Sequence, residues 1–242
     1  MNAQLSHWEM KRNRFISFLA LLSLFCMLFL PTGKAQTGTT FTADATMDTY
    51  IDFGRGLDIE ALDTLKDGDQ LTITFWMRWL DKNNADVDNW ANIFTLSDSS
   101  GSGDNGVFWM QHKNDNSKLE FAIHSTGRNY IQSSTTVQDS EWYHVAAVYN
   151  GSLFSNNMRL YINGSQESSR NKTGNLRATP NKSKLTAGRW SNPGNDYREF
   201  HGELDEISLW NIALSEDQID TLMVNHEAIT GTGCYTAGLL GF

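Results

Sequence analysis

Residues 71–80 read LTITFWMRWL, and bulky apolar side chains recur there at every second position. One side of this stretch carries Leu71, Ile73, Phe75, Met77 and Trp79. A period of two is that of a β-strand, in which successive side chains point to opposite faces of a sheet. Because the stretch is also rich in β-branched and aromatic residues, it predicts a central strand with one face in the core.

The same alternation recurs along most of the chain. Further strands are predicted over residues 50–53, 91–96, 107–112, 118–124, 142–149, 158–162, 184–187 and 200–210. The segments between them contain turn-forming pairs such as Asn150-Gly151 and Asn163-Gly164. Many short strands that are joined by Gly/Asn turns, with no helices between them, predict an all-β fold built as an antiparallel sandwich.

One segment near the C-terminus has helical features instead. Ser215 is a good N-cap residue, and Gln218 three positions later completes a capping box. Ile219, Leu222 and Met223 form one apolar stripe at helical spacing. We therefore expect one short amphipathic helix that packs against the sandwich.

The N-terminus has the features of a secretory signal. Three basic residues within 11–14 precede a 16-residue apolar run over 15–30, and Gly33-Lys34-Ala35 follows with the small residues that signal peptidases prefer. We predict a signal peptide over residues 1–35, a single domain over residues 36–242, and a protein that is secreted or held at the cell surface. The apolar run is shorter than a membrane span, so no span is expected after the signal is removed.

Charge and cysteine content narrow the choice of partners. The net charge is −9, and removal of residues 1–35 leaves 15 basic and 27 acidic residues, a net of −12. This acidic balance argues against nucleic acid as a partner. Cys26 leaves with the signal and Cys234 is then alone, so no intrachain disulfide is expected, and stability must come from the size of the core or from a bound metal. The apolar end over residues 239–242 is compatible with further domains of a longer chain.

Three segments carry a family resemblance: EWYHVAAVY at 141–149, MRLYING at 158–164 and FHGELDEISLWNIALS at 200–215. Together they resemble the concanavalin A-like lectin/glucanase superfamily, in the laminin G-like and pentraxin-like branch found in secreted bacterial proteins. The resemblance implies a jelly-roll β-sandwich of two antiparallel sheets, one of them concave. This fold carries hydrolases, lectins and adhesion modules, so the resemblance does not name a ligand.

The resemblance also implies a structural calcium ion that is ligated by Asp205, with Asp48 and Asp44 as further ligands. The apolar residues around Asp205 change parity, from Leu204 to Ile207, which predicts a β-bulge at this point of the strand. Calcium takes several oxygen ligands, which carboxylates and turn carbonyls can supply. The alternative is a solvated carboxylate on the strand.

Residues 203–206, Glu-Leu-Asp-Glu, are close to the catalytic strand motif of glycoside hydrolases in the same superfamily. A retaining glycosidase needs two carboxylates about 5 Å apart in one cleft. Ile207 occupies the required alternate position, and Glu206 would point to the opposite face of the strand. A glucanase-type glycosidase is therefore kept only as an alternative.

The loop over residues 189–198 combines two aromatic rings with polar residues. Sugars stack on such rings while amide, carboxylate and guanidinium groups bond their hydroxyls. The predicted ligand-binding residues are Trp190, Tyr197, Asn195 and Arg198. In the alternative the rings fold back as a plug, and a site on the concave face would then involve Trp109, Gln111 and Arg128.

These observations predict a secreted, non-catalytic lectin-like module that binds carbohydrate or another surface polymer and is stabilised by calcium. The other functions left open are the glucanase-type enzyme and a structural adhesion or protein-binding domain.

Overall fold

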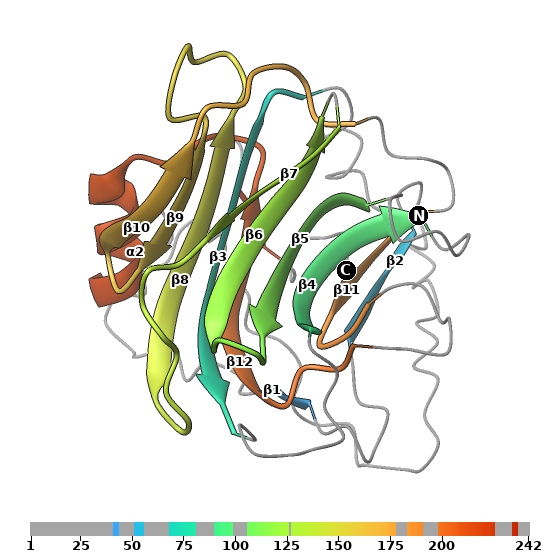
Figure 1. Ribbon diagram of the computed structural model, residues 1–242, viewed down its shortest axis with the longest axis vertical. Coiled ribbons are helices and arrows are strands. Elements are labelled where there is room, and N and C mark those ends of the chain that lie inside the picture. The colour runs from blue at the N-terminus through green and yellow to red at the C-terminus, as the bar shows by residue number, and fades with distance from the viewer. Residues whose placement is uncertain are drawn as a thin grey trace, which may run out of the picture.

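The computed structural model describes residues 41–43, 51–55, 68–80, 90–98, 106–125, 127–177, 183–190, 198–225 and 234–236. Two antiparallel sheets stack face to face (Figure 1). The seven-stranded sheet has the order β1-β12-β3-β8-β9-β10 with β13 pairing with β12, and the six-stranded sheet has the order β2-β11-β4-β5-β6-β7. The all-β jelly-roll sandwich with one short helix is confirmed, whereas the predicted signal peptide lies outside the described residues.

The strands of the seven-stranded sheet are β1 (Phe41–Ala43), β3 (Gln70–Trp79), β8 (Trp142–Asn150), β9 (Met158–Ile162), β10 (Ser165–Arg170), β12 (Gly202–Trp210) and β13 (Cys234–Thr236). Those of the six-stranded sheet are β2 (Ile51–Arg55), β4 (Trp90–Asp98), β5 (Gly106–Lys113), β6 (Lys118–Ser125), β7 (Gly127–Gln132) and β11 (Ser183–Ala187). The helix is α2 (Glu216–Asn225). None of the helices within the described ranges has the length and apolar character to span a bilayer.

The core lies between the sheets and uses the face that the alternation in β3 predicts. Every apolar side chain on that face, from Leu71 to Trp79, is at most 1% exposed. Phe108 and Phe121 meet them from the six-stranded sheet and are fully buried. Phe108 and Met110 of β5, and Phe121 of β6, point into the core, so the residues between or next to them, Trp109 and Glu120, point to the outer face of the six-stranded sheet.

The predicted helix covers part of the outer face of the seven-stranded sheet. The capping box is present: the Ser215 N–H donates to Oε1 of Gln218 at 2.9 Å, and the Gln218 N–H donates to Oγ of Ser215 at 3.3 Å. Ile219 is fully buried against Tyr161 and Trp210 of the sheet. Packing of this apolar stripe fixes α2 beside β9 and β10 (Figure 1).

The bulge predicted from the parity change is confirmed in β12. The pairing of β12 with β3 shifts register between Asp205 and Ser208. Glu206 has a φ of 49°, and its N–H donates to Oδ1 of Asp205 at 2.8 Å. The bulge lets Leu204 and Ile207 both reach the core although they differ in parity.

Four strands, β1, β7, β10 and β13, were not among those predicted. Of these, β7 and β10 each lie at an edge of their sheet. Their sequences, GRNYIQ and SQESSR, show little apolar alternation because edge strands are only partly covered. The edge strand β10 is tied to the segment after β7 by Glu167, whose carboxylate accepts hydrogen bonds from the Thr135 N–H at 2.7 Å and from the Ser134 hydroxyl.

Candidate functional site

The described ends of the predicted ligand loop pack onto the six-stranded sheet. Trp190 is 7% exposed, and its ring meets that of Trp109 edge-on, with 5.9 Å between centroids. The guanidinium carbon of Arg198 lies 5.5 Å from the centre of the Trp190 ring. Trp190 is therefore packed as a plug and does not present the open ring that a sugar platform requires, while Asn195 and Tyr197 lie outside the described residues.

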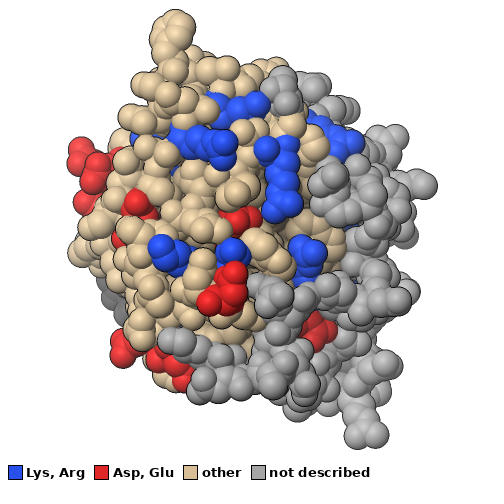
Figure 2. All heavy atoms as spheres, in the orientation of Figure 1, with Lys and Arg blue, Asp and Glu red and all other residues tan. Residues whose placement is uncertain are grey.

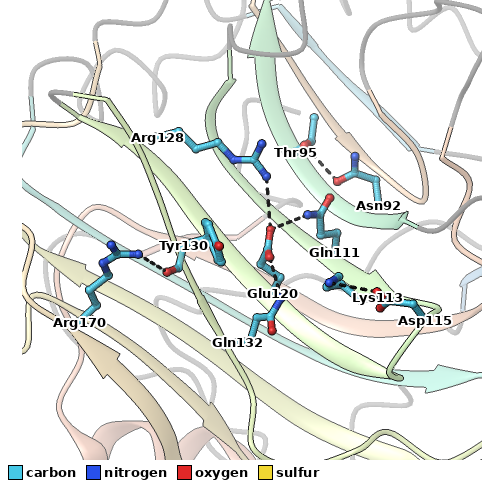
Figure 3. Close-up of polar contacts among 10 residues, drawn as sticks. All are labelled: Asn92, Thr95, Gln111, Lys113, Asp115, Glu120, Arg128, Tyr130, Gln132 and Arg170. Atoms are coloured by element: carbon cyan, nitrogen blue, oxygen red, sulfur yellow. Dashed lines mark hydrogen bonds and ion pairs between the residues drawn. The ribbon is translucent and has the colours of Figure 1, made fainter.

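A buried carboxylate on the outer face of the six-stranded sheet lies amid a cluster of polar side chains (Figure 3). The side chain of Glu120 on β6 is 1% exposed. Gln111 Nε2 donates to its Oε1 at 2.7 Å from β5, and Gln132 Nε2 donates to its Oε2 at 3.0 Å from β7. Nη2 of Arg128 lies 3.6 Å from Oε1. Because a buried charge is costly unless it is paired and hydrogen-bonded, these three partners explain how the carboxylate is held here.

Strand register brings these side chains together. Gln111 is the partner of Glu120 across β5 and β6, and Glu120 is the partner of Gln132 across β6 and β7. Residues directly opposite on neighbouring strands have Cβ atoms about 5 Å apart, which suits a row of hydrogen-bonded side chains. The cluster is thus a consequence of sheet pairing and of the outward parity of these positions.

One donor and one acceptor beside this cluster are unsatisfied. Asn92 on β4 pairs in register with Gln111, and Thr95 Oγ1 donates to Asn92 Oδ1 at 3.4 Å. Asn92 Nδ2 and Gln111 Oε1 are buried and have no hydrogen-bond partner within the described part of the chain. A water can both accept from an amide NH₂ and donate to an amide oxygen, so an enclosed water can complete this pair.

Guanidinium groups and aromatic rings alternate at the exposed side of the cluster. The guanidinium carbon of Arg128 lies 5.1 Å from the Trp109 ring centre and 5.8 Å from that of Tyr130. Arg170 lies 6.0 Å from the Tyr130 ring centre, and its Nη1 donates to the Tyr130 carbonyl oxygen at 3.0 Å. Tyr130 is 46% exposed and the Arg128 side chain is 43% exposed. The exposed part of the site is therefore a tyrosine ring between two positioned cations.

The remaining predicted site residues lie elsewhere. Asp205 is half-buried at the β12 bulge, and Asp44 and Asp48 are outside the described residues. Among the described residues no group of three or more His, Cys, Asp or Glu side chains is placed to hold a metal ion. Glu203, the first carboxylate of the glycosidase-like segment, forms an ion pair with Arg78 of β3.

Sequence reasoning offered Trp109, Gln111 and Arg128 as residues of a concave face, with a core position as the alternative for Trp109, and did not single out Glu120, Tyr130 or Gln132. The available signal was Glu120 itself, a charged residue between Leu119 and Phe121 in a predicted strand. A carboxylate at the outward positions of an otherwise apolar strand is a candidate for a polar site. Its partners depend on strand order, which the sequence does not supply.

The family profile described as the concanavalin A-like lectin/glucanases superfamily matches residues 48–220. No curated protein sequence matches the chain. Among solved structures, a Bacteroides ovatus protein described as an inferred carbohydrate binding protein aligns with a TM-score of 0.54 at 17% identity, over 72% of this chain and 46% of that chain.

The CBM40 of the Ruminococcus gnavus IT-sialidase, solved with alpha2,6 sialyllactose bound, aligns with a TM-score of 0.54 at 13% identity, over 76% of this chain and 97% of that chain. The NanB sialidase of Streptococcus pneumoniae aligns with a TM-score of 0.57 at 19% identity, over 75% of this chain but 27% of the sialidase. The chain thus spans less than half of the Bacteroides protein and about a quarter of NanB. At these identities the likeness establishes the fold.

Proposed function

Because this chain belongs to the concanavalin A-like lectin/glucanases superfamily, we propose that it is a lectin-like module that binds carbohydrate on the outer face of its six-stranded sheet. Two structures of this fold support the proposal at a coarse level: the Bacteroides protein is described as carbohydrate-binding, and the Ruminococcus module was solved with sialyllactose. A fold alone does not decide function, so the proposal depends on the site itself.

The observation that carries the proposal is the half-exposed Tyr130 ring between Arg128 and Arg170, beside the buried Glu120 network. An aromatic face packs against the apolar face of a sugar ring, and guanidinium groups donate hydrogen bonds to hydroxyl or carboxylate oxygens. Since Gln111 and Gln132 hold Glu120, and Arg128 contacts both Glu120 and two rings, these groups are positioned before a ligand arrives. Preorganised groups lose less entropy on binding.

Arg198 flanks the same face, since its carbonyl oxygen accepts from the Asn92 N–H at 2.7 Å. Arg198, Asn195 and Tyr197 stay in the proposal as ligand-binding residues.

Export, calcium and the absence of catalysis complete the proposal. Residues 1–35 act as a signal peptide, so the module works outside the cytoplasm. A calcium ion held by Asp205, with Asp48 and Asp44, stabilises the fold in the absence of a disulfide. The pairing of Glu203 with Arg78 supports a structural role for that carboxylate rather than the role of a glycosidase acid or nucleophile.

A glycan array of neutral and acidic oligosaccharides, with and without EDTA, tests the proposal. The purified protein should bind a defined saccharide class, and Tyr130→Ala should weaken binding by about 1 kcal/mol, or fivefold, as expected for loss of one aromatic contact. Trp142→Ala is the matched control, because Trp142 is 37% exposed and lies under Arg78 on the outer face of the other sheet. Equal losses in the two variants would place the ligand elsewhere, and no saccharide binding at all would overturn the proposal.

A further inference from the structure

The loop between β8 and β9 projects from one end of the sandwich (Figure 1). Phe154 at its tip is 99% exposed, and the neighbouring Leu153 is 40% exposed. No other large apolar side chain in the described ranges is so open to solvent. Such exposure of an apolar ring is unfavourable in water unless another surface covers it.

Hydrogen bonds hold the loop in this projecting form. Asn157 is fully buried, and its Nδ2 donates to the carbonyl oxygens of Asn150, at 2.8 Å, and of Leu153. Its Oδ1 accepts from the Lys172 N–H at 2.9 Å, and the Asn156 N–H donates to Oδ1 of Asn171 at 2.8 Å. The base of the loop is therefore tied to the chain that follows β10, and the ring at its tip is displayed rather than folded back.

The segment that follows β10 is basic. Residues 168–177 contain three Lys or Arg and no Asp or Glu, although the whole chain has a net charge of −9. Arg170 pairs in register with Met158, the first residue of β9. The backbone N–H of Lys172 donates to Oδ1 of Asn157 in the loop. Figure 2 shows Lys and Arg gathered below the projecting loop. Asp69 adds one acidic residue at the base, where its carbonyl oxygen accepts from Gly151.

An apolar tip beside cations matches the chemistry of an anionic lipid surface. Peripheral proteins bind bilayers stably when an inserted apolar group acts together with a basic patch. A stable protein partner would instead need about 800 Å² on each side with an apolar centre. Here the apolar part is limited to Leu153 and Phe154, since Ser152, Ser155 and Asn156 surround them.

We propose that the β8–β9 loop is a membrane-contact element, in which Phe154 and Leu153 enter the headgroup region of an anionic bilayer while Arg170 and Lys172 pair with lipid phosphates. The backbone N–H of Lys172 donates to Oδ1 of Asn157, so Lys172 is held next to the base of the loop. Arg170 is shared with the proposed saccharide site through its contact with Tyr130, whereas Phe154, Leu153 and Lys172 belong to the membrane contact alone.

Vesicle sedimentation of the full chain tests the proposal. The protein should sediment with vesicles of phosphatidylcholine and phosphatidylglycerol, and much less with phosphatidylcholine alone. Phe154→Ser should weaken binding to the mixed vesicles about tenfold, as expected when a buried phenyl ring is lost. Lys172→Glu should weaken binding to the mixed vesicles about fivefold or more. Added salt should also weaken this binding, because it screens the attraction between the cations and the lipid phosphates.

The matched control is Val224→Ser, because Val224 is an exposed apolar residue on α2, 66% open to solvent. It should leave vesicle binding unchanged, and all variants should melt like the parent protein since none removes a buried side chain. Equal sedimentation of the parent and Phe154→Ser, or equal binding to both vesicle types, would overturn the proposal. These vesicles contain no saccharide, so failure of the carbohydrate proposal does not affect the result.

Discussion

Replacement of Trp190 by alanine separates a packed ring from a sugar platform. Trp190 is 7% exposed and contacts Trp109 and the guanidinium of Arg198. Truncation of a buried Trp costs about 3–5 kcal/mol, and the lower end applies here because the cluster is a small one on the outer face of a sheet. We expect Trp190→Ala to lower the free energy of unfolding by about 3 kcal/mol, or the Tm by about 6–12 °C.

Urea unfolding followed by circular dichroism measures this loss, since the signal does not depend on the removed Trp. Trp142→Ala is the control: its ring is more than a third exposed, so its removal should cost less than about 1 kcal/mol. A loss at Trp190 as small as that at Trp142, together with lost saccharide binding, would refute the packing argument. That result would support the alternative, in which the Trp190 ring stacks on the saccharide.

Three further predictions concern the stability of the fold. Burial raises the pKa of Glu167, but hydrogen bonds from Ser134 and Thr135 lower it more, so the pKa of the folded state is below its usual value. The stabilisation by this carboxylate is therefore present above the unfolded-state pKa and is lost as pH falls through the folded-state pKa. On acidification from neutral pH, the Tm of the parent protein should fall more than the Tm of Glu167→Gln. Equal falls in the Tm of the two proteins would contradict this. Ser215→Ala should cost about 1 kcal/mol in urea unfolding through loss of the helix cap, and an unchanged midpoint would speak against the capping box. If Asp205 holds calcium, calcium should raise the Tm and Asp205→Ala should abolish the rise, with about 2.7 kcal/mol gained at a hundredfold excess over Kd; a Tm indifferent to calcium and EDTA would exclude the site.

The fold could be predicted where one face of a strand is buried. The alternation over residues 71–80 defined a central strand, and the parity change between Leu204 and Ile207 indicated the bulge that the structure has. The start of α2 could also be predicted, because the two residues of a capping box are only three positions apart in the sequence. Strands β7 and β10 were missed because edge strands bury too little apolar surface to show a period of two.

The candidate site was less predictable because its contacts are non-local. The sequence offered Gln111 and Arg128 as residues of one concave face, but the network around Glu120 exists only because β5, β6 and β7 are neighbours in the sheet. The packing of Trp190 likewise depends on Trp109, some eighty residues earlier in the chain. No periodicity in the loop sequence could reveal that contact.

The most direct test of saccharide binding on the six-stranded sheet is a map of the contact residues in solution. Amide chemical shifts of the labelled protein would be followed during titration with the best saccharide from the array. The account predicts that the largest changes cluster on β5, β6 and β7, around Gln111, Glu120 and Tyr130. Changes confined to the outer face of the seven-stranded sheet around Trp142, or the absence of any change with saturating saccharide, would contradict it.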